Sequence, residues 1–381
     1  MTLMEEYEQR TAWKYEPIRG RFSTHPGLDD KVSPDGSFRH FPGNTAVFRP
    51  DRDTFRLARL MQAALHSHLD DTGMLAEPLP ESTLHMTLHD LVSPGQGASG
   101  GEAEYVRETE NSLEEAVRIV GGIREKAAGR EIAMIPDRIV NMVSKSLVLL
   151  LKPASERDFD LLLRMYREFD AVRPLPYPLT PHITLAYYRP GPIDGDRLGA
   201  VIDRMQPAPR AAPVCTLTPE ALTAQSFSDM AHYRDVPARI CFCCDGGMNR
   251  SVMCAAVLNH MAKARGLKLR AQARSAFPNT HGRAIPGEVR STLERHGIEP
   301  DLAAGTARYL DDKDFAAFTA FAAVSEGAFD RFAMLGLPEG KYGALSGIFC
   351  GIRDPAYGSS YEEAFADITA RMERLIADGR I

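Results

Sequence analysis

Cys244-Asp245-Gly246-Gly247-Met248-Asn249-Arg250-Ser251 is the stretch of sequence that decides the fold of the second half of this chain. It follows an apolar run at 238–244 and precedes a run at 251–258 that is typical of a helix. This order predicts a strand, a tight turn and a helix start, where backbone N–H groups point at a bound anion. A thiol stands at one end of the turn and a guanidinium at the other. The pattern therefore indicates a phosphate-binding loop that contains a nucleophile.

The polar residues of this loop suit that chemistry. Partial positive charge at a helix start favours the thiolate of Cys244, which is the nucleophilic form of cysteine. Arg250 can hold two phosphoryl oxygens through its planar guanidinium. The residues between them are expected to line the phosphate site: Asp245, Gly246, Gly247, Met248 and Asn249. The alternative is a structural, buried Cys244, because a Cys and an Arg at this spacing also arise by chance.

The loop resembles that of the low-molecular-weight protein tyrosine phosphatases, whose Cys-x5-Arg-Ser loop follows the first strand. The resemblance covers residues 236–381 and includes a late Asp354-Pro355 pair before a helical stretch that begins at Tyr361. It implies that Cys244 attacks phosphorus, Arg250 stabilises the equatorial oxygens and Ser251 hydrogen-bonds the thiolate. It also implies that Asp354 protonates the leaving oxygen and later activates water, without a metal or cofactor. An ordinary turn is the alternative for the Asp-Pro pair.

Three residues depart from the pattern of that family. Gly247 stands where the family usually has an Asn in the left-handed conformation, which glycine adopts without strain. Asn249 replaces the second cysteine of the loop, so the usual disulfide with Cys244 is not available. Ala356 replaces an aromatic residue beside the pocket, and the only tryptophan, Trp13, lies far away in the sequence. A phosphotyrosine ring is therefore expected to lack its usual stacking partners.

A second pattern occurs twice in the first half of the chain. Thr83-Leu84-His85-Met86-Thr87-Leu88 and Pro181-His182-Ile183-Thr184-Leu185-Ala186 both contain His-x-Thr followed by Leu. In a strand, residues i and i+2 share a face, so His85 and Thr87 should point into one cleft, as should His182 and Thr184. Two imidazoles can divide the acid and base roles, and two hydroxyls can hydrogen-bond a phosphodiester. The alternative is a pair of half-buried strand histidines with no catalytic role.

This pair resembles the two-histidine (2H, LigT-like) phosphoesterases, which act on 2',3'-cyclic or 2'-5' phosphodiesters without metal. The resemblance covers about residues 40–235. His89 and Tyr188 fall on the faces of the two histidines if each strand continues regularly, so either could line the cleft or lie at the surface. The expected elements are a strand at 43–48, a helix at 53–68, a strand at 146–151, a helix at 155–169 and a last strand within 224–233.

Together the two patterns predict two domains. Residues 1–235 are expected to form an α+β two-histidine phosphoesterase domain that is two-lobed, with antiparallel sheets and helices outside. Residues 236–381 are expected to form an α/β domain with a central parallel sheet and the Cys-x5-Arg loop. The glycine-rich segment 93–101 is expected to be mobile, and the proline-rich run 206–213 to be a loop within the first domain.

The composition excludes several classes of protein. The chain has 381 residues, 44% of them hydrophobic and 25% charged, and a net charge of −6, so bulk attraction to nucleic acid or membrane is not expected. Without a run long enough to span a membrane and with an acidic start, it is expected to be cytoplasmic. Cysteine spacing does not suggest a zinc site. The alternating Lys268, Arg270 and Arg274 predict a basic strand face, either a solvated edge or an attraction for a polyanion.

The leading functional hypothesis combines the two chemistries. A cyclic phosphodiesterase leaves a phosphomonoester, which is the substrate of a Cys-x5-Arg phosphatase. The chain is therefore expected to open a cyclic phosphate, such as a 2',3'-cyclic nucleotide, an RNA end or ADP-ribose cyclic phosphate, and then to remove the exposed phosphate. The expected partners are phosphorylated small molecules, nucleotides or RNA ends, with a phosphoprotein as a further candidate and no membrane or metal. One alternative is a protein tyrosine phosphatase with a non-catalytic nucleotide- or RNA-binding N-terminal domain, and another is a binding protein with inert sites.

Overall fold

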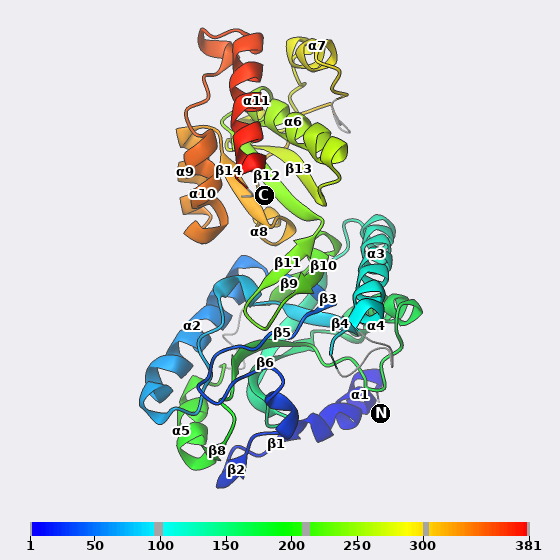
Figure 1. The fold of residues 1–381 in the computed structure, drawn as a ribbon, viewed down its shortest axis with the longest axis vertical. Helices are drawn as coiled ribbons and strands as arrows, with labels where there is room; N and C mark the ends of the chain where they lie inside the picture. Colours follow the sequence, from blue (N-terminus) through cyan, green and yellow to red (C-terminus); the bar gives the residue numbers. More distant parts are fainter. Residues whose placement is uncertain (1, 95–101, 208–213, 300–304, 379–381) are drawn as a thin grey trace. The chain divides into compact units, whose positions relative to one another are not determined.

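The computed structural model describes residues 2–94, 102–207, 214–299 and 305–378 (Figure 1). Contacts divide the chain into two compact units, Met1–Val236 and Pro237–Ile381, one residue beyond the predicted boundary. Residues 95–101 and 208–213 lie outside the described residues. They make up most of the predicted mobile insert at 93–101 and of the predicted proline-rich loop at 206–213. Among the described helices, none is both long and apolar enough to cross a membrane.

The N-terminal unit is built on an antiparallel sheet of nine strands (Figure 1). The strand order is β1-β5-β6-β7-β4-β3-β10-β11, and β9 pairs with β5 beside this path. These strands are β1 (Tyr15–Glu16), β3 (Gly43–Phe48), β4 (Met86–Val92), β5 (Ile132–Met142), β6 (Ser146–Pro153), β7 (His182–Tyr187), β9 (Cys215–Leu217), β10 (Leu222–Phe227) and β11 (Tyr233–Val236). A separate antiparallel pair consists of β2 (Arg21–Ser23) and β8 (Pro192–Asp194).

The centre of this sheet joins two halves. β4 is flanked by β3 and β7 by β6, and the halves meet where Met86 of β4 pairs with Ile183 of β7. Both of these side chains are fully buried. Because side chains alternate along a strand, the residues on either side of Met86 and Ile183 point to the opposite face. Both His-x-Thr patterns are centred on this pair.

The described residues of the N-terminal unit include five α-helices. They are α1 (Leu3–Thr11), α2 (Arg52–Leu69), α3 (Glu102–Lys126), α4 (Glu156–Glu168) and α5 (Gly195–Met205). Asp51 caps α2 by accepting a hydrogen bond from the Thr54 N–H, and Ser155 caps α4 in the same way. α2 packs against β7, α3 against β10 and β3, and α4 against β5. Among the helices that the structure describes, α3 is the longest, and its sequence pattern had not been interpreted as a helix.

Most of the predicted elements of this unit are confirmed, with one exception. The strands at 43–48 and 146–151 and the helices at 53–68 and 155–169 correspond to β3, β6, α2 and α4. The single last strand expected within 224–233 is wrong, because β10 and β11 form a hairpin in which Phe227 pairs with Tyr233. β10 also pairs with β3, so the hairpin completes one half of the sheet.

The C-terminal unit has the predicted central parallel sheet. Three parallel strands in the order β13-β12-β14 span Leu269–Ser275, Ala238–Cys244 and Ala320–Ala323, with β12 in the middle. The helices are α6 (Arg250–Arg265), α7 (Gly287–Arg295), α8 (Asp314–Ala317), α9 (Glu326–Met334), α10 (Glu339–Phe349) and α11 (Tyr361–Ala377). α6 packs against β13 and α11, while α9 and α10 pack against β14 (Figure 1). Because β12 is covered on both faces, its apolar residues run without alternation, as is usual for a parallel strand.

The predicted basic face of β13 is wrong at one of its residues. Arg270 is exposed, but Arg274 is buried and its Nε lies 3.0 Å from Oδ2 of the buried Asp314. The guanidinium carbon of Arg274 also lies 4.9 Å from the centre of the Phe318 ring. α8 supplies Asp314, so this arginine belongs to an internal ion pair and not to a surface that attracts a polyanion.

Candidate active sites

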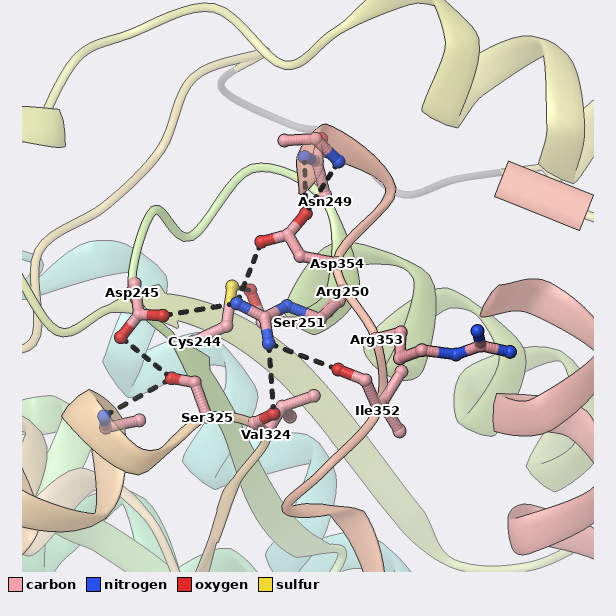
Figure 2. Close-up of polar contacts among 12 residues, drawn as sticks. Cys244, Asp245, Asn249, Arg250, Ser251, Val324, Ser325, Ile352, Arg353 and Asp354 are labelled. Atoms are coloured by element: carbon pink, nitrogen blue, oxygen red, sulfur yellow. Dashed lines mark hydrogen bonds and ion pairs between the residues drawn. The ribbon is translucent and has the colours of Figure 1, made fainter. Parts of the chain in front are cut away.

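The predicted nucleophile, Cys244, lies at the end of the central strand of the C-terminal unit. Cys244 is the last residue of β12 and is 1% exposed. Its Sγ lies 3.2 Å from the Ser251 Oγ (Figure 2). The same sulfur accepts a hydrogen bond from the Gly247 N–H at 3.3 Å. The loop therefore places the sulfur of Cys244 beside a backbone N–H and a hydroxyl group at the start of α6.

Gly247 is required by this loop for two separate reasons. Its φ is +64°, the left-handed conformation that was expected at this position. In addition, a Cβ atom built on Gly247 would lie 2.7 Å from the Ser275 Cβ and 2.8 Å from the Ser275 N. An Asn, which the family pattern has here, could adopt this dihedral angle, but its Cβ would clash with Ser275. The sequence does not show that β13 packs so closely against the loop.

Arg250 is held at the mouth of the loop by two carbonyl groups. Its Nη1 donates to the Ile352 O at 3.2 Å and to the Val324 O at 3.4 Å. Its Nη2 lies 2.8 Å from Oδ2 of Asp354 and 3.2 Å from Oδ2 of Asp245 (Figure 2). The Nε is buried and has no hydrogen-bond partner among the described residues. A buried donor of this kind requires an acceptor, and a phosphoryl oxygen would supply one.

Asp354 reaches the loop from a segment distant in the sequence. It begins a short 3-10 helix, Pro355–Tyr357, and its Oδ1 accepts a hydrogen bond from the Ala356 N–H at 3.0 Å. The same oxygen accepts a hydrogen bond from the Asn249 Nδ2 at 3.2 Å. The Tyr361 hydroxyl in turn donates to the Asn249 Oδ1 at 3.4 Å. Asn249 therefore positions the carboxyl group, a contact that sequence reasoning had missed because it considered only phosphate binding.

The remaining loop residues surround the sulfur. Asp245 directs its carboxylate away from Cys244 and accepts a hydrogen bond from the Ser325 Oγ at 2.9 Å, beside its contact with Arg250 (Figure 2). Ser325 also caps α9. Gly246 lies near the terminal methyl group of Met248. The loop is thus tied to the ends of β13 and β14, where parallel sheets commonly bind ligands.

Exposed aromatic residues occur in two segments that adjoin this loop or Asp354. Phe277 is 46% exposed, and its N–H donates to the Asp245 O at 3.3 Å. Tyr357, three residues after Asp354, is 90% exposed. The contact of Phe277 with the loop was not predicted from the sequence. The position of Phe277, two residues beyond the carboxyl end of β13, was the available signal.

Comparison with known families agrees with this geometry. Residues 239–378 match the family model of the low molecular weight phosphotyrosine protein phosphatases. The C-terminal unit contains a low-molecular-weight phosphatase domain. The match begins inside β12 and ends in the residue that follows α11, so it includes the nucleophile loop and the Asp-Pro segment. No curated protein matches the chain significantly.

Solved structures of phosphatases resemble the same part of the chain. A low molecular weight protein tyrosine phosphatase from Streptococcus pyogenes is 18% identical, with 37% of this chain and 92% of that chain covered and a TM-score of 0.32. The YwlE arginine phosphatase from Geobacillus stearothermophilus is 25% identical, with 38% and 94% covered and a TM-score of 0.31. A low molecular weight protein tyrosine phosphatase from T. tengcongensis is 22% identical, with 37% and 99% covered and a TM-score of 0.29.

A second candidate site lies outside the phosphatase domain, in the N-terminal unit. A cavity of about 320 Å³ is lined by His85, Thr87, His182 and Thr184, so all four predicted side chains meet in one place. Continuing the antiparallel register by one residue on either side of Met86 and Ile183 places each histidine beside the threonine of the other strand. The two patterns therefore form an approximately symmetric set of two imidazoles and two hydroxyls.

A bulge follows each His-x-Thr pattern and corrects the predicted cavity lining. The pairing of β4 with β3 skips Leu88, and the pairing of β7 with β6 skips Leu185. The carbonyl of Leu185 instead accepts a hydrogen bond from Gln62 of α2 at 3.2 Å. Because one extra residue shifts the alternation, Asp90 and Tyr187 line the cavity.

The positions proposed for His89 and Tyr188 are therefore wrong. His89 is buried with its ring centre 4.8 Å from that of Tyr166, and it neither lines the cavity nor lies at the surface. Tyr188 is also buried, 5.9 Å from the ring of Phe22. Regular alternation along the strand predicts the opposite orientation for these two side chains. It fails because a bulge in a short strand leaves no simple signal in the sequence.

Both imidazoles of the cavity are neutral at neutral pH. Burial, helped by the neighbouring His182 and opposed by Asp235 and Asp90, lowers the pKa of His85 to about 4. Burial likewise lowers the pKa of His182. The His182 Nδ1, however, lies 2.6 Å from the Thr180 O and donates to it, which favours the protonated ring. His85 has no equivalent bond, since its Nδ1 is buried without a partner among the described residues.

Charged and aromatic residues complete the wall of the cavity. The ammonium of Lys14 donates to the Thr180 Oγ1 at 2.8 Å, and burial lowers its pKa to about 8. Asp90 accepts a hydrogen bond from the Tyr177 hydroxyl at 2.8 Å. The ring of Tyr233 lies 5.0 Å from that of His85. The wall also includes Trp13, Lys31, Phe41, Lys145 and Phe227. This lining suits a ligand with both a ring and negative charge.

Proposed function

We propose that the chain hydrolyses phosphate esters at two sites, opening a cyclic phosphodiester in the N-terminal unit and removing a phosphomonoester in the phosphatase domain. The observation that carries the second activity is the set of contacts around Cys244: two donors within 3.3 Å of its sulfur, and an arginine that touches the carboxyl group of Asp354. The grouping of two His-x-Thr patterns on one cavity supports the first activity. We place the boundary between the two domains at about residue 236.

In the phosphatase domain, the reaction proceeds in two displacements. The Cys244 thiolate attacks phosphorus while the bond from phosphorus to the leaving oxygen breaks, and protonated Asp354 gives its proton to that oxygen. A phosphocysteine results. Water then attacks phosphorus and passes a proton to the Asp354 carboxylate, the P–S bond breaks, and phosphate and the thiolate are released. Arg250 and the loop amides hold the three equatorial oxygens in both steps.

In the N-terminal cavity, the two histidines divide the proton transfers. The bond from the His182 Nδ1 to the Thr180 carbonyl stabilises an imidazolium, whereas His85 lacks such a bond. We therefore assign His182 as the general acid and His85 as the general base. His85 takes a proton from water as the water oxygen bonds to phosphorus, and His182 protonates the ester oxygen that leaves. The hydroxyls of Thr87 and Thr184 hold the non-bridging oxygens.

A time course with adenosine 2',3'-cyclic phosphate tests the sequence of reactions. The wild-type chain should release inorganic phosphate and adenosine, as followed by phosphorus NMR and chromatography. The Cys244→Ser variant should accumulate adenosine monophosphate, and the His182→Ala variant should leave the cyclic substrate intact. Release of phosphate by Cys244→Ser at the wild-type rate would contradict the proposal, as would ring opening by His182→Ala.

A protein phosphatase with a non-catalytic N-terminal unit is the second candidate function. The match of residues 239–378 to a phosphotyrosine phosphatase family and the exposed rings of Phe277 and Tyr357 favour it. The YwlE structure adds arginine phosphate to the protein substrates worth testing. Hydrolysis of phosphotyrosine or phosphoarginine peptides at least about tenfold faster than adenosine monophosphate, unaffected by His85→Ala, would establish it in place of the bifunctional enzyme.

A further inference from the structure

Two lysines of the N-terminal cavity have no role in the reaction described above. Lys31 follows a short 3-10 helix, Pro26–Leu28, and Lys145 belongs to the turn between β5 and β6. Both are half-buried, and both line the cavity that holds the two His-x-Thr patterns. They come from segments far apart in the sequence, so the fold brings them together.

The two ammonium groups repel each other. Burial lowers the pKa of Lys31, and the charge of Lys145 lowers it further, against the opposing effects of Asp90 and Asp30. Within residues 2–94, 102–207, 214–299 and 305–378, neither ammonium forms an ion pair or a hydrogen bond. Lys31 lies 4.8 Å from the centre of the Phe41 ring, and Asp90 is already bonded to Tyr177. Two like charges in a half-buried cavity are unfavourable unless an anion lies between them.

The turn that carries Lys145 is also strained. Val143 and Ser144 have φ values of +45° and +50°, and they are the non-glycine residues with positive φ among those that the structure describes. The Lys145 N–H donates to the Met142 O at 3.0 Å, which closes a tight turn that would normally contain Asn and Gly. A β-branched residue in the left-handed region costs free energy. The turn nevertheless places both Val143 and Lys145 in the cavity wall.

The lysine pair and the imidazoles come from different segments of the chain. His182 belongs to β7 and His85 lies directly before β4, whereas Lys31 and Lys145 lie outside both strands. All four side chains line the same cavity. With a volume of about 320 Å³, the cavity is large enough for one small molecule to reach both positions.

We propose that Lys31 and Lys145 bind a second phosphate group on the same molecule whose cyclic phosphodiester lies between His85 and His182. The proposal rests on the phosphodiesterase function proposed above and narrows its substrate class. A cyclic nucleotide with a further 5'-phosphate, an RNA end or an ADP-ribose cyclic phosphate carries such a group. A simple nucleoside 2',3'-cyclic phosphate does not, and is expected to be a poor substrate.

The test compares two substrates that differ only in this group, adenosine 2',3'-cyclic phosphate and 5'-phosphoadenosine 2',3'-cyclic phosphate. Two charge-assisted contacts should raise kcat/KM for the second substrate by about 10- to 100-fold in the wild-type chain. In the Lys31→Met/Lys145→Met double variant the ratio of the two kcat/KM values should fall to about one, while Lys31→Arg/Lys145→Arg should keep most of the preference. Raising the ionic strength should also reduce the preference.

Lys152→Met is a matched control, because Lys152 is an exposed lysine of β6 that pairs with Glu8 outside this cavity. It should keep the wild-type ratio. Equal kcat/KM values for both substrates in the wild-type chain would overturn the subsite and leave the phosphodiesterase function standing. Opening of neither substrate would overturn that function and the subsite with it. If the double variant has a lowered Tm, the single variants decide, since an unchanged ratio in both would overturn the proposal.

Discussion

The two candidate sites of this protein are built in opposite ways. In the phosphatase domain, the proposed nucleophile, the loop glycines and the arginine come from one continuous loop, residues 244–251, and Asp354 is contributed from a distant segment. In the N-terminal unit, no two consecutive residues belong to the set of two histidines and two threonines, and the register of β4 against β7 decides whether they meet. A local loop can be recognised from its sequence, whereas a site assembled across strands depends on pairing that the sequence does not state.

The sites also differ in the surroundings of their reacting groups. The Cys244 Sγ accepts a hydrogen bond from the Gly247 N–H and lies 3.2 Å from the Ser251 Oγ. His85 and His182 are deprived of water, and burial lowers the pKa of both. The two imidazoles therefore become charged only when a substrate or acid supplies the proton. The predictions below separate these two designs.

Removal of the sulfur should have the largest effect and should be confined to one site. Cys244→Ala should lower kcat for hydrolysis of p-nitrophenyl phosphate by at least about 10⁴-fold, because no other described group replaces the nucleophile. Opening of a cyclic nucleotide should continue at the wild-type rate. Cys241→Ala, on the opposite face of the same strand, is the control. Loss of both activities in Cys244→Ala would show that the two sites are not independent.

Removal of the proton donor should have the next largest effect. Asp354→Asn should reduce kcat by about 10²- to 10⁴-fold for alkyl phosphates, whose leaving oxygen needs a proton. The loss should be much smaller for p-nitrophenyl phosphate, because its leaving group departs as an anion. Steady-state kinetics over a series of phenyl and alkyl phosphates measures this difference. An equal loss for all substrates would indicate that Asp354 binds substrate and does not act as the acid.

Substitution of the loop glycine should affect stability as well as catalysis. Gly247→Asn should lower the free energy of unfolding by about 2–4 kcal/mol, because a side chain there must displace Ser275 of β13. Gly282→Asn is the matched control, since Gly282 has a φ of +80° but open space around it. Urea denaturation of the two variants separates the cost of the left-handed conformation from the cost of the steric contact with Ser275. Equal losses would mean that the contact with β13 is unimportant.

The N-terminal site should respond to pH in the direction set by its buried histidines. Since burial lowers the pKa of both, the singly protonated pair that the reaction needs becomes more abundant as pH falls from about 8 toward 5.5. We expect kcat/KM for ring opening to rise by up to about tenfold per pH unit over this range. The same depressed values mean that the unfolded chain binds more protons below about pH 6.5, so stability falls there and Tm must be recorded at each pH. A rate that rises with pH would contradict the assignment.

Loss of the contact between Asn249 and Asp354 should have the smallest effect. Asn249→Ala removes one hydrogen bond to the carboxyl group and should lower kcat for alkyl phosphates by about three- to tenfold. The variant should show the same dependence on leaving group as Asp354→Asn, on a smaller scale. A loss that does not depend on the leaving group would assign Asn249 to phosphate binding instead. Tyr361→Phe removes the hydrogen bond from the Tyr361 hydroxyl to Asn249. Its kcat for alkyl phosphates should lie between those of Asn249→Ala and the wild type.

The extent of prediction from sequence follows the same contrast between the two sites. The strand, turn and helix around Cys244 could be predicted because apolar runs and glycines there are consecutive. β12 has the expected bounds, and α6 begins one residue before the expected helical run. The contact between Gly247 and Ser275, and the position of Phe277, could not be predicted because both depend on the neighbouring strand. Even for a local motif, the sequence does not show which residues of neighbouring strands contact it.

Prediction was weaker in the N-terminal unit for a definite physical reason. Alternation placed His85 and Thr87 on one face, as the structure has them, but it failed after the bulge at Leu88. Bulges depend on how many residues the partner strand offers, and Leu88 itself looks like any other strand leucine. The lysines of the cavity were not predicted at all, since Lys31 and Lys145 belong to no periodic pattern and meet only through the fold.

The anchoring of Arg250 has a consequence for how the phosphatase site opens. The guanidinium bonds to the carbonyl of Ile352 and to the carboxylate of Asp354, which lie on one short segment (Figure 2). Any outward swing of that segment to let product escape must therefore release the arginine as well as withdraw the acid. Phosphate affinity and catalytic activity should therefore change together. With the segment displaced, Arg250 is no longer anchored to bind phosphate and Asp354 is too far away to donate a proton.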